Sequence, residues 1–270
     1  MKRRAFLQVG AALAGGTAAW HGATEPAVGG DPETAAPTTV LVTSAQVPSM
    51  RRLADGLAER FAVRLTAPEP VSTELPFTQS ELEPGEALDA LVREVGTIVI
   101  AGPPTAAEDE FQQVDAGPRQ LFHLLHAAAS AGVQRVIYLS SLELVSGYDP
   151  AYMVDEDWRP WGEIDRGYLP LQLGEFCCRE FARERKLQVV VLRLGSLVTP
   201  ETEPPAEERQ VVLQERDLLQ AVRQAIEAES PFDARGLQSW SVIHILSHAP
   251  DNRFPLQRAR RLLGYEPQSG

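Results

Sequence analysis

The sequence predicts an α/β fold, a doubly wound parallel sheet with helices on both faces and a short C-terminal segment that completes it. Two observations support this fold class. Short apolar runs alternate with longer segments whose apolar residues are spaced three and four apart, as in an amphipathic helix. The runs lack polar alternation, which is typical of strands buried on both faces of a parallel sheet. Strict alternation of strands and helices gives a doubly wound sheet with right-handed crossovers.

The expected elements follow one another in order, separated by Gly and Pro. The first strand is expected at the β-branched run Val40–Thr43, and the first helix at Ser49–Phe61, where apolar residues recur at helical spacing. The later strands are expected at Val63–Thr66, Thr97–Ala101, Arg135–Leu139 and Val189–Arg193. The later helices are expected at Glu86–Val95, Arg119–Ala131 and Leu171–Lys186.

Composition narrows the class of protein. The chain of 270 residues is 44% apolar and 23% charged, which excludes a disordered, collagen-like or disulfide-scaffold protein. The 37 acidic residues outnumber the 25 basic ones, which argues against a nucleic-acid partner because a phosphate-tracking surface needs the opposite sign. Beyond a short, interrupted N-terminal run, no segment approaches the ~20 apolar residues of a membrane span.

The N-terminus resembles a secretory signal of the twin-arginine type. Arg3 and Arg4 precede a Gly/Ala-rich apolar stretch that ends in small residues. We expect residues 1–24 to be this signal, 25–39 a linker, 40–200 the sheet domain and 201–270 the C-terminal segment. The protein would then be exported to the periplasm or another extracytoplasmic space. The alternative is a chance basic start followed by a core helix, which the glycines would weaken.

Several motifs then occur in a recognisable order. They are a first strand and turn (40–45), a strand with a double serine (131–141), an acidic loop and tyrosine helix (154–175), Leu-Arg-Leu-Gly (192–195) with Pro200, and a closing helix (259–267). Together they resemble the NAD-dependent epimerase/dehydratase family, the extended branch of the short-chain dehydrogenase/reductase superfamily. The resemblance implies a Rossmann-like NAD(P)-binding domain, with NAD or NADP as cofactor and a sugar or nucleotide-sugar as substrate.

The resemblance locates a dinucleotide loop whose glycines are replaced. The family uses three glycines, for a tight turn, for close approach to the pyrophosphate and for helix–strand packing. The corresponding residues are Ser44, Val47 and Met50. A β-branched Val47 disfavours a positive φ and places methyl groups where a phosphate would lie, and Met50 would push the helix off the strand. Pro48 removes one N–H donor.

Some capacity for anion binding remains in this loop. The helix expected from Ser49 presents free N–H groups and the positive end of its dipole, with Arg51 and Arg52 in its first turn. A phosphate could be held there, or both arginines could be solvated surface. By resemblance, the candidate cofactor residues of the loop are Ser44, Ala45, Val47, Pro48, Ser49, Met50 and Arg51.

The resemblance places the adenosine end of the cofactor further along the chain. The family uses an acid after the second strand for the ribose, and an Asp followed by an apolar residue beside the adenine. The nearest matches are Glu69, displaced by a residue or two, and the pair Glu81 and Leu82. Ala101 and Gly102, where the strand Thr97–Ala101 ends, complete the candidate cofactor residues.

The expected reaction centre is also altered. Family catalysis uses a tyrosine as general acid/base and a lysine four residues on, whose charge stabilises the phenolate on the same helix face. Tyr168 is followed at that spacing by the uncharged Gln172, and Pro170 between them suggests that the helix starts later or bends. Ser141 is the candidate for the substrate-binding hydroxyl, because Leu142 follows it. The alternative for Tyr168 is a half-buried tyrosine without a catalytic role.

The histidines and cysteines do not form a recognisable metal site, and none is expected. The pairs considered are His123 and His126, His244 and His248, and Cys177 and Cys178. The two cysteines are adjacent within a helical stretch, which is poor geometry for a disulfide, and core packing is expected of them.

Three hypotheses about function remain. By resemblance, the chain is a divergent oxidoreductase or epimerase of a sugar or nucleotide-sugar, with weak or lost activity because the glycines and the lysine are replaced. The first alternative is an exported pseudoenzyme that binds a ligand or a protein partner, with or without a cofactor. The second is a periplasmic sugar-binding or scaffold protein. The family often forms homodimers through the helices that correspond to Arg119–Ala131 and Leu171–Lys186, so a homodimer is expected by resemblance.

Overall fold

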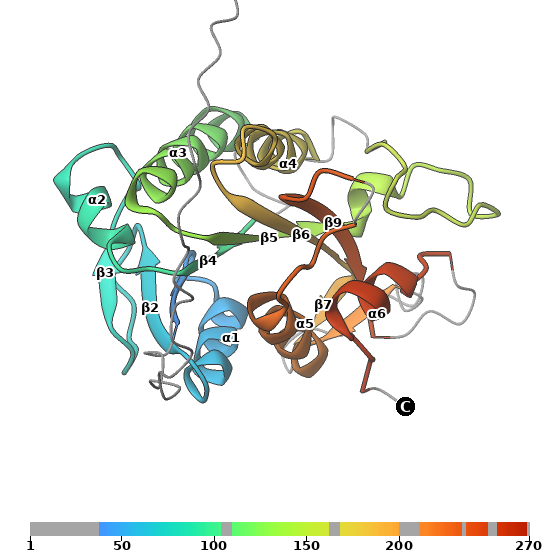
Figure 1. The fold of residues 1–270 in the computed structure, drawn as a ribbon, viewed down its shortest axis with the longest axis horizontal. Coiled ribbons are helices and arrows are strands. Elements are labelled where there is room, and N and C mark those ends of the chain that lie inside the picture. The colour runs from blue at the N-terminus through green and yellow to red at the C-terminus, as the bar shows by residue number, and fades with distance from the viewer. Residues whose placement is uncertain are drawn as a thin grey trace, which may run out of the picture. The chain divides into compact units, whose positions relative to one another are not determined.

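The computed structural model describes residues 38–103, 110–161, 168–199, 211–233, 236–247 and 253–268, with side chains of the third helix described from residue 114. Within these ranges, seven strands form one parallel sheet in the order β3-β2-β1-β4-β5-β6-β9 (Figure 1). The doubly wound α/β fold predicted from the sequence is confirmed. The expected signal, nearly all of the expected linker, and His248 lie outside the described residues.

The sheet is wound outward in two directions from β1. Its strands are β1 (Thr39–Val42), β2 (Ala62–Ala67), β3 (Phe77–Gln79), β4 (Thr97–Ala101), β5 (Arg135–Ser141), β6 (Gln188–Leu194) and β9 (Trp240–Ile245). Val40 of β1 pairs with Val63 of β2 on one side and with Thr97 of β4 on the other. The chain therefore changes direction between β1 and β4, and sheets of this kind bind ligands outside the carboxyl ends of the strands at such a switch point.

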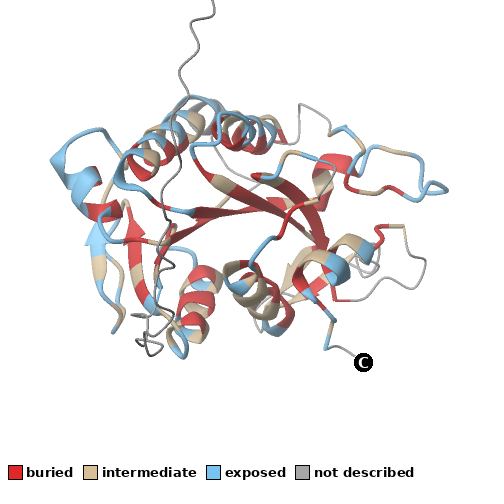
Figure 2. Cartoon of the chain, in the orientation of Figure 1, coloured by how far each residue is buried: buried red, intermediate tan, exposed pale blue. Residues whose placement is uncertain are grey.

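Helices cover both faces of the sheet (Figure 1). One face carries α2 (Glu86–Val92), α3 (Glu110–Ala131) and α4 (Tyr168–Arg183), and the other carries α1 (Pro48–Ala58), α5 (Glu215–Glu227) and α6 (Gln257–Leu263). Figure 2 shows that burial is concentrated on the strands and on the inward sides of these helices. Each fully buried Leu, Ile or Val contributes about 1.5–3 kcal/mol, so the two apolar layers stabilise the fold.

Two helices begin earlier than the sequence predicts. The α3 helix begins at Glu110 rather than Arg119 and contains Pro118, and α4 begins at Tyr168 rather than Leu171. The expectation that α4 starts after Pro170 is wrong. Pro170 lies in the first helical turn, where its missing N–H costs no intrahelical hydrogen bond.

The C-terminal segment contributes the strand β9 to the main sheet and two helices to its core. After residue 210 the chain forms β8 (Val212–Gln214), which pairs with β7 (Ser196–Val198), and then α5, β9 and α6. A Cβ on Gly56 of α1 would lie 2.6 Å from Leu219 of α5, so these two helices are in close contact. The buried Arg135 of β5 donates hydrogen bonds to three carbonyls where α5 ends. This segment therefore completes one face of the fold.

Candidate functional site

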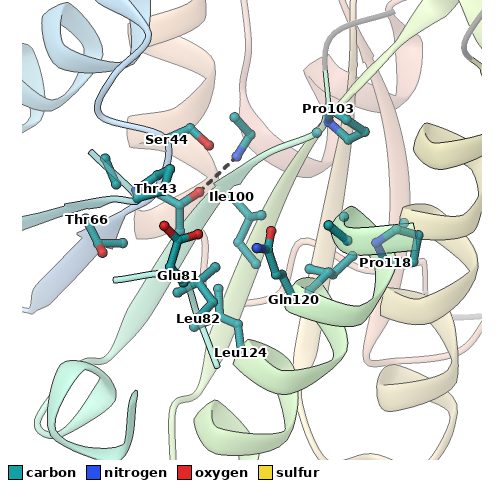
Figure 3. Close-up of a pocket in the computed structure, with 18 of the residues that line it drawn as sticks. Thr43, Ser44, Thr66, Glu81, Leu82, Ile100, Pro103, Pro118, Gln120 and Leu124 are labelled. Carbon is teal, nitrogen blue, oxygen red and sulfur yellow. Dashed lines mark hydrogen bonds between the residues drawn. The ribbon is translucent and has the colours of Figure 1, made fainter. Parts of the chain in front are cut away.

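A cavity of about 590 Å³ opens at the carboxyl ends of β1, β2 and β4, beside the switch point (Figure 3). The loop after β1, the ends of β2 and β4, residues 80–82 and one side of α3 line it, together with Pro170 and Gly174 of α4. Ligand sites in proteins commonly enclose about 300–1,000 Å³. Both its position and its size therefore make this cavity the candidate site.

The loop between β1 and α1 is held in place by backbone hydrogen bonds. The N–H of Thr43 donates to Val99 O of β4 at 3.0 Å, and the N–H of Ala45 donates to Thr66 O of β2 at 3.1 Å. Ser44 takes a positive φ of 59°, and its carbonyl accepts from the N–H of Val47 at 2.9 Å. The loop therefore makes a tight turn without a glycine, with Ser44 in the left-handed conformation.

One expectation about the replaced glycines is wrong. Val47 has a φ of −81°, so its β-branched side chain is not forced into a positive φ. Val47 is 39% exposed and lines the cavity. Met50 is buried in the same core cluster as Val40 and Val42 of β1, so its side chain packs between the helix and the sheet.

The loop keeps donors that have no acceptor in the described part of the chain. The N–H groups of Gln46 and Ser49 take part in no hydrogen bond there, and Pro48, at the first position of α1, has no N–H. Val47 caps the helix without a side-chain hydrogen bond. Free N–H groups at a helix N-terminus, with the positive end of the dipole, favour an anion.

The two arginines of the first turn are engaged with the protein. Arg51 Nη1 donates to the carbonyl oxygens of Ala45 at 2.6 Å and Gln46 at 3.1 Å. Arg52 Nε donates to Glu215 Oε1 of α5 at 2.7 Å. Neither arginine is among the described residues that line the cavity. Both arginines are half-buried, and each is paired within the protein.

The structure separates the two acids that the resemblance assigns to the adenosine. Glu69 is exposed and does not line the cavity, whereas the neighbouring Pro68 does. Glu81 and Leu82 both line it, and Glu81 is the one charged residue among the described lining residues. The Leu82 N–H donates to Ser80 Oγ at 3.1 Å, and Leu82 itself has a positive φ of 56°.

The far wall is formed by the end of β4 and by α3. Ala101 and Gly102 line the cavity as expected by position, and the Ala101 N–H donates to Thr43 Oγ1 at 3.4 Å, the bond dashed in Figure 3. Gln120 projects its amide from α3 into the cavity (Figure 3). Sequence reasoning did not find Gln120, because a polar residue on a helix gives no signal until the helix is placed.

The three candidate catalytic residues do not meet in the cavity. Tyr168 is buried among apolar side chains of the α3/α4 face, and Gln172, one turn later in α4, is exposed. Ser141 Oγ accepts the N–H of Glu143 at 3.1 Å, where it caps the 3₁₀ helix η1 (Leu142–Val145). None of the three is among the described lining residues. Their catalytic roles stay predictions.

A buried polar group that sequence reasoning missed lies at the α4 wall instead. The hydroxyl of Tyr138, on β5, has no hydrogen-bond partner in the described part of the chain, and burial raises its pKa well above the usual value. A Cβ on Gly174 would lie 2.0 Å from this hydroxyl oxygen, and one on Gly102 would lie 3.2 Å away. The sequence does contain one signal of this contact, because a glycine inside a helix, as at position 174, can mark a place where another side chain lies close to the helix backbone.

The polar side chains next to Tyr138 are paired with one another inside the protein. Arg193 of β6 forms a bidentate ion pair with Glu175 of α4, at 2.9 Å and 2.8 Å, and Ser140 Oγ donates to the same carboxylate at 2.7 Å. His244 of β9 lies opposite Arg193 in the sheet and is fully buried. Burial, followed by the charges of Arg193 and Arg258, holds the pKa of His244 well below its ordinary value.

Among the described residues, no group of His, Cys, Asp and Glu side chains is placed to bind a metal ion. In the same ranges, no helix has the length and apolar character needed to cross a membrane.

Comparison with known proteins gives one sequence relative. No family model matches the chain. The uncharacterized protein YtbQ of Bacillus subtilis is 27% identical over 173 residues, a match that covers 59% of this chain and 63% of that protein. The match thus spans less than two thirds of the relative's length.

Solved structures give a wider match. Uronate dehydrogenase from Agrobacterium tumefaciens is 21% identical, with 86% of this chain and 85% of that chain covered and a TM-score of 0.72. Glucuronic acid dehydrogenase from Chromohalobacter salexigens is 18% identical, with 87% of this chain and 85% of that chain covered and a TM-score of 0.73. UDP-glucuronic acid 4-epimerase from Bacillus cereus was solved with UDP-glucuronic acid and NAD. It is 16% identical, with 86% of this chain and 95% of that chain covered and a TM-score of 0.66. This chain therefore shares its fold with these two dehydrogenases and this epimerase.

Proposed function

We propose that this chain binds NAD in the cavity at the ends of β1, β2 and β4, and that it is a divergent oxidoreductase or epimerase of a sugar or nucleotide-sugar with weak or lost activity. The loop after β1 is the observation that carries the proposal. Its turn is tight, it borders the cavity, and its N–H groups at Gln46 and Ser49 donate to no described acceptor. Such donors suit a diphosphate.

The described residues fit the parts of a dinucleotide. The diphosphate would lie against the loop of Ser44 and Gln46. The adenosine would lie toward Pro68, Glu81 and Leu82, and the nicotinamide toward Gly102. All of these residues line the same cavity, and NAD-bound structures with this fold support the assignment.

The charge of the cavity favours NAD over NADP. Its described lining residues include no Lys, Arg or His, and Glu81 is acidic. The 2′-phosphate of NADP would therefore meet no cation, whereas proteins that use NADP commonly place an arginine there. We expect NADP to bind at least about tenfold more weakly than NAD, a difference of about 1.4 kcal/mol.

The catalytic end supports weak or lost activity. A bound nicotinamide would accept or donate hydride, while the protein would orient the substrate and move a proton. By resemblance that proton belongs to Tyr168, but Gln172 supplies no charge beside it. Tyr168 is buried among apolar side chains, outside the described cavity lining. The same observation favours the second candidate, an exported pseudoenzyme that binds NAD or another ligand without turnover.

Binding and turnover can be tested separately with the purified protein. We expect NAD to raise the unfolding temperature, because a ligand at 100 times its Kd adds about 2.7 kcal/mol of stability. Glucuronic acid and UDP-glucuronic acid would then be incubated with NAD while the absorbance of reduced nicotinamide is followed. Binding without turnover would favour the pseudoenzyme. No thermal response to millimolar NAD would contradict the proposal.

We further propose a homodimer through α3 and α4. Phe122 on α3 and Phe176 on α4 are 49% and 60% exposed, which leaves apolar surface on both helices. Light scattering should give twice the monomer mass for the wild type and the monomer mass for Phe122→Asp/Phe176→Asp. A monomeric wild type at micromolar concentration would contradict this proposal.

Export by the twin-arginine route is also a proposal, and it depends on residues outside the described ranges. Replacing Arg3 and Arg4 with lysines should leave the precursor in the cytoplasm, as judged by fractionation. Continued export of that variant would argue for another route.

A further inference from the structure

One arginine of α1 is folded back onto the loop that borders the cavity. Arg51 lies in the first turn of α1, and its Nη1 donates to the carbonyl oxygens of Ala45 and Gln46, at 2.6 Å and 3.1 Å. Both carbonyls belong to the turn between β1 and α1. Hydrogen bonds from a guanidinium are charge-assisted and stronger than neutral ones, so this contact restrains the turn.

Fixing one carbonyl of the turn also fixes an N–H. The C=O and N–H of a trans peptide point in opposite directions across its plane, and none of the described peptide bonds is cis. When Ala45 O is held toward Arg51, the N–H of Gln46 in the same peptide points away from Arg51. That N–H donates to no described acceptor, and Gln46 lines the cavity.

We propose that Arg51 is a positioning residue for a diphosphate: it orients the Ala45–Gln46 peptide so that the Gln46 N–H is free to donate to the ligand. The inference rests on the proposed function of the cavity. In this chain an arginine on the helix and a left-handed Ser44 together restrain a turn that contains no glycine. Arg51 itself is not a described lining residue, so its action is through the backbone and not by direct contact with a phosphate.

The test compares ligands with and without a diphosphate. Binding of NAD, ADP-ribose and adenosine to the wild type and to Arg51→Met, which keeps an unbranched chain of similar length, would be measured by calorimetry and NMR. We expect Arg51→Met to weaken NAD and ADP-ribose about tenfold, the loss typical of one hydrogen bond to a charged group, and to leave adenosine within about twofold. Arg60→Met is the matched control, because it removes an arginine beyond the other end of α1, where Arg60 pairs with Glu227.

Backbone mobility separates positioning from direct contact. Under our inference, Arg51→Met lowers the NMR order parameter of the Gln46 N–H in the ligand-free protein, because the Ala45–Gln46 peptide loses its restraint. An unchanged order parameter, an equal loss for adenosine, or unchanged binding of ADP-ribose by Arg51→Met would each overturn the inference and leave the proposed function standing. A folded wild type that binds neither NAD nor ADP-ribose would overturn both.

Discussion

Two regions of the fold, the β1–α1 loop and the carboxyl ends of β5 and β6, use their polar groups differently. At the β1–α1 loop, N–H groups are left without described acceptors, and Ser44 holds a positive φ of 59°. At the carboxyl ends of β5 and β6, Ser140 and Arg193 both donate to the buried carboxylate of Glu175 on α4. The first region has donors available for a ligand, whereas the second has its charges paired within the protein.

The two regions are held in place by different groups. The loop is restrained mainly by backbone hydrogen bonds and the Arg51 contact, and it makes its turn without a glycine. The network depends on specific side chains, so one substitution can leave a charge buried without its partner. We therefore expect the largest changes in stability from substitutions in the network and smaller ones from substitutions in the loop.

The largest effect is expected from breaking the buried ion pair. Glu175→Ala leaves the Arg193 guanidinium buried without its carboxylate, and we expect a loss of about 3–5 kcal/mol in the free energy of unfolding, measured with urea. Glu180→Ala, on the same helix, breaks the exposed pair with Arg183 and should cost less than about 1 kcal/mol. Equal losses in both variants would mean that the network adds little stability.

Acid should weaken the same region through His244. Burial lowers its pKa, so the folded state keeps the imidazole neutral while the unfolded state binds a proton below about pH 6.5. Stability is therefore lost as the pH falls below that value, by up to about 1.4 kcal/mol per pH unit. Urea unfolding from pH 7 to 5 should show this loss in the wild type and a flatter profile in His244→Leu.

The control for His244 is the exposed His126, whose replacement with glutamine should keep the wild-type profile. Glu156 accepts a hydrogen bond from the backbone N–H of His244, and burial raises the pKa of the Glu156 carboxyl group. The contribution of Glu156 to stability therefore changes with pH in the opposite direction to that of His244. The wild type and His244→Leu both contain Glu156, so the difference between their profiles excludes the contribution of Glu156. Identical profiles for wild type and His244→Leu would show that His244 is not the source of the acid sensitivity.

A smaller effect of opposite sign is expected at the loop. Ser44→Gly removes the cost of a left-handed conformation in a residue with a Cβ, and we expect a gain of about 1 kcal/mol in the free energy of unfolding. Ser49→Gly, in the first turn of α1, should give no gain, because its conformation is helical. Thermal unfolding of both variants would measure the difference. A loss on Ser44→Gly would mean that the Ser44 side chain stabilises the turn by more than its backbone costs.

The sequence predicts the sheet well because burial on both faces leaves a simple signal. The runs Thr97–Ala101 and Val189–Arg193 are almost entirely apolar, and each is a central strand. The short β3 strand has little apolar character and gives no such signal. The buried Glu175–Arg193 pair could not be predicted either, because it joins two residues whose proximity depends on how α4 lies on the sheet.

The candidate site was predictable in position and not in detail. The switch point follows from strand order, and that places Ser44, Ala101 and Gly102 at the cavity. The Arg51 contact with Ala45 depends on a side-chain conformation, and the burial of Tyr168 depends on where α4 begins. Because neither follows from a local pattern, sequence reasoning assigned the arginines to phosphate binding and the tyrosine to catalysis.

The smallest effect is expected from Tyr168→Phe. The side chain of Tyr168 packs among apolar residues of the α3/α4 face, and its hydroxyl is in no hydrogen bond within the described ranges. We expect a change of less than about 1 kcal/mol in unfolding free energy and an unchanged affinity for NAD, because a tyrosine outside the cavity contributes only packing. Any measurable turnover should also survive. If the substitution abolishes turnover while NAD still binds, the start of α4 must move on substrate binding and bring the phenol of Tyr168 to the cavity. The distance of Tyr168 from the cavity would then reflect the conformation of the ligand-free protein and not a lost catalytic role.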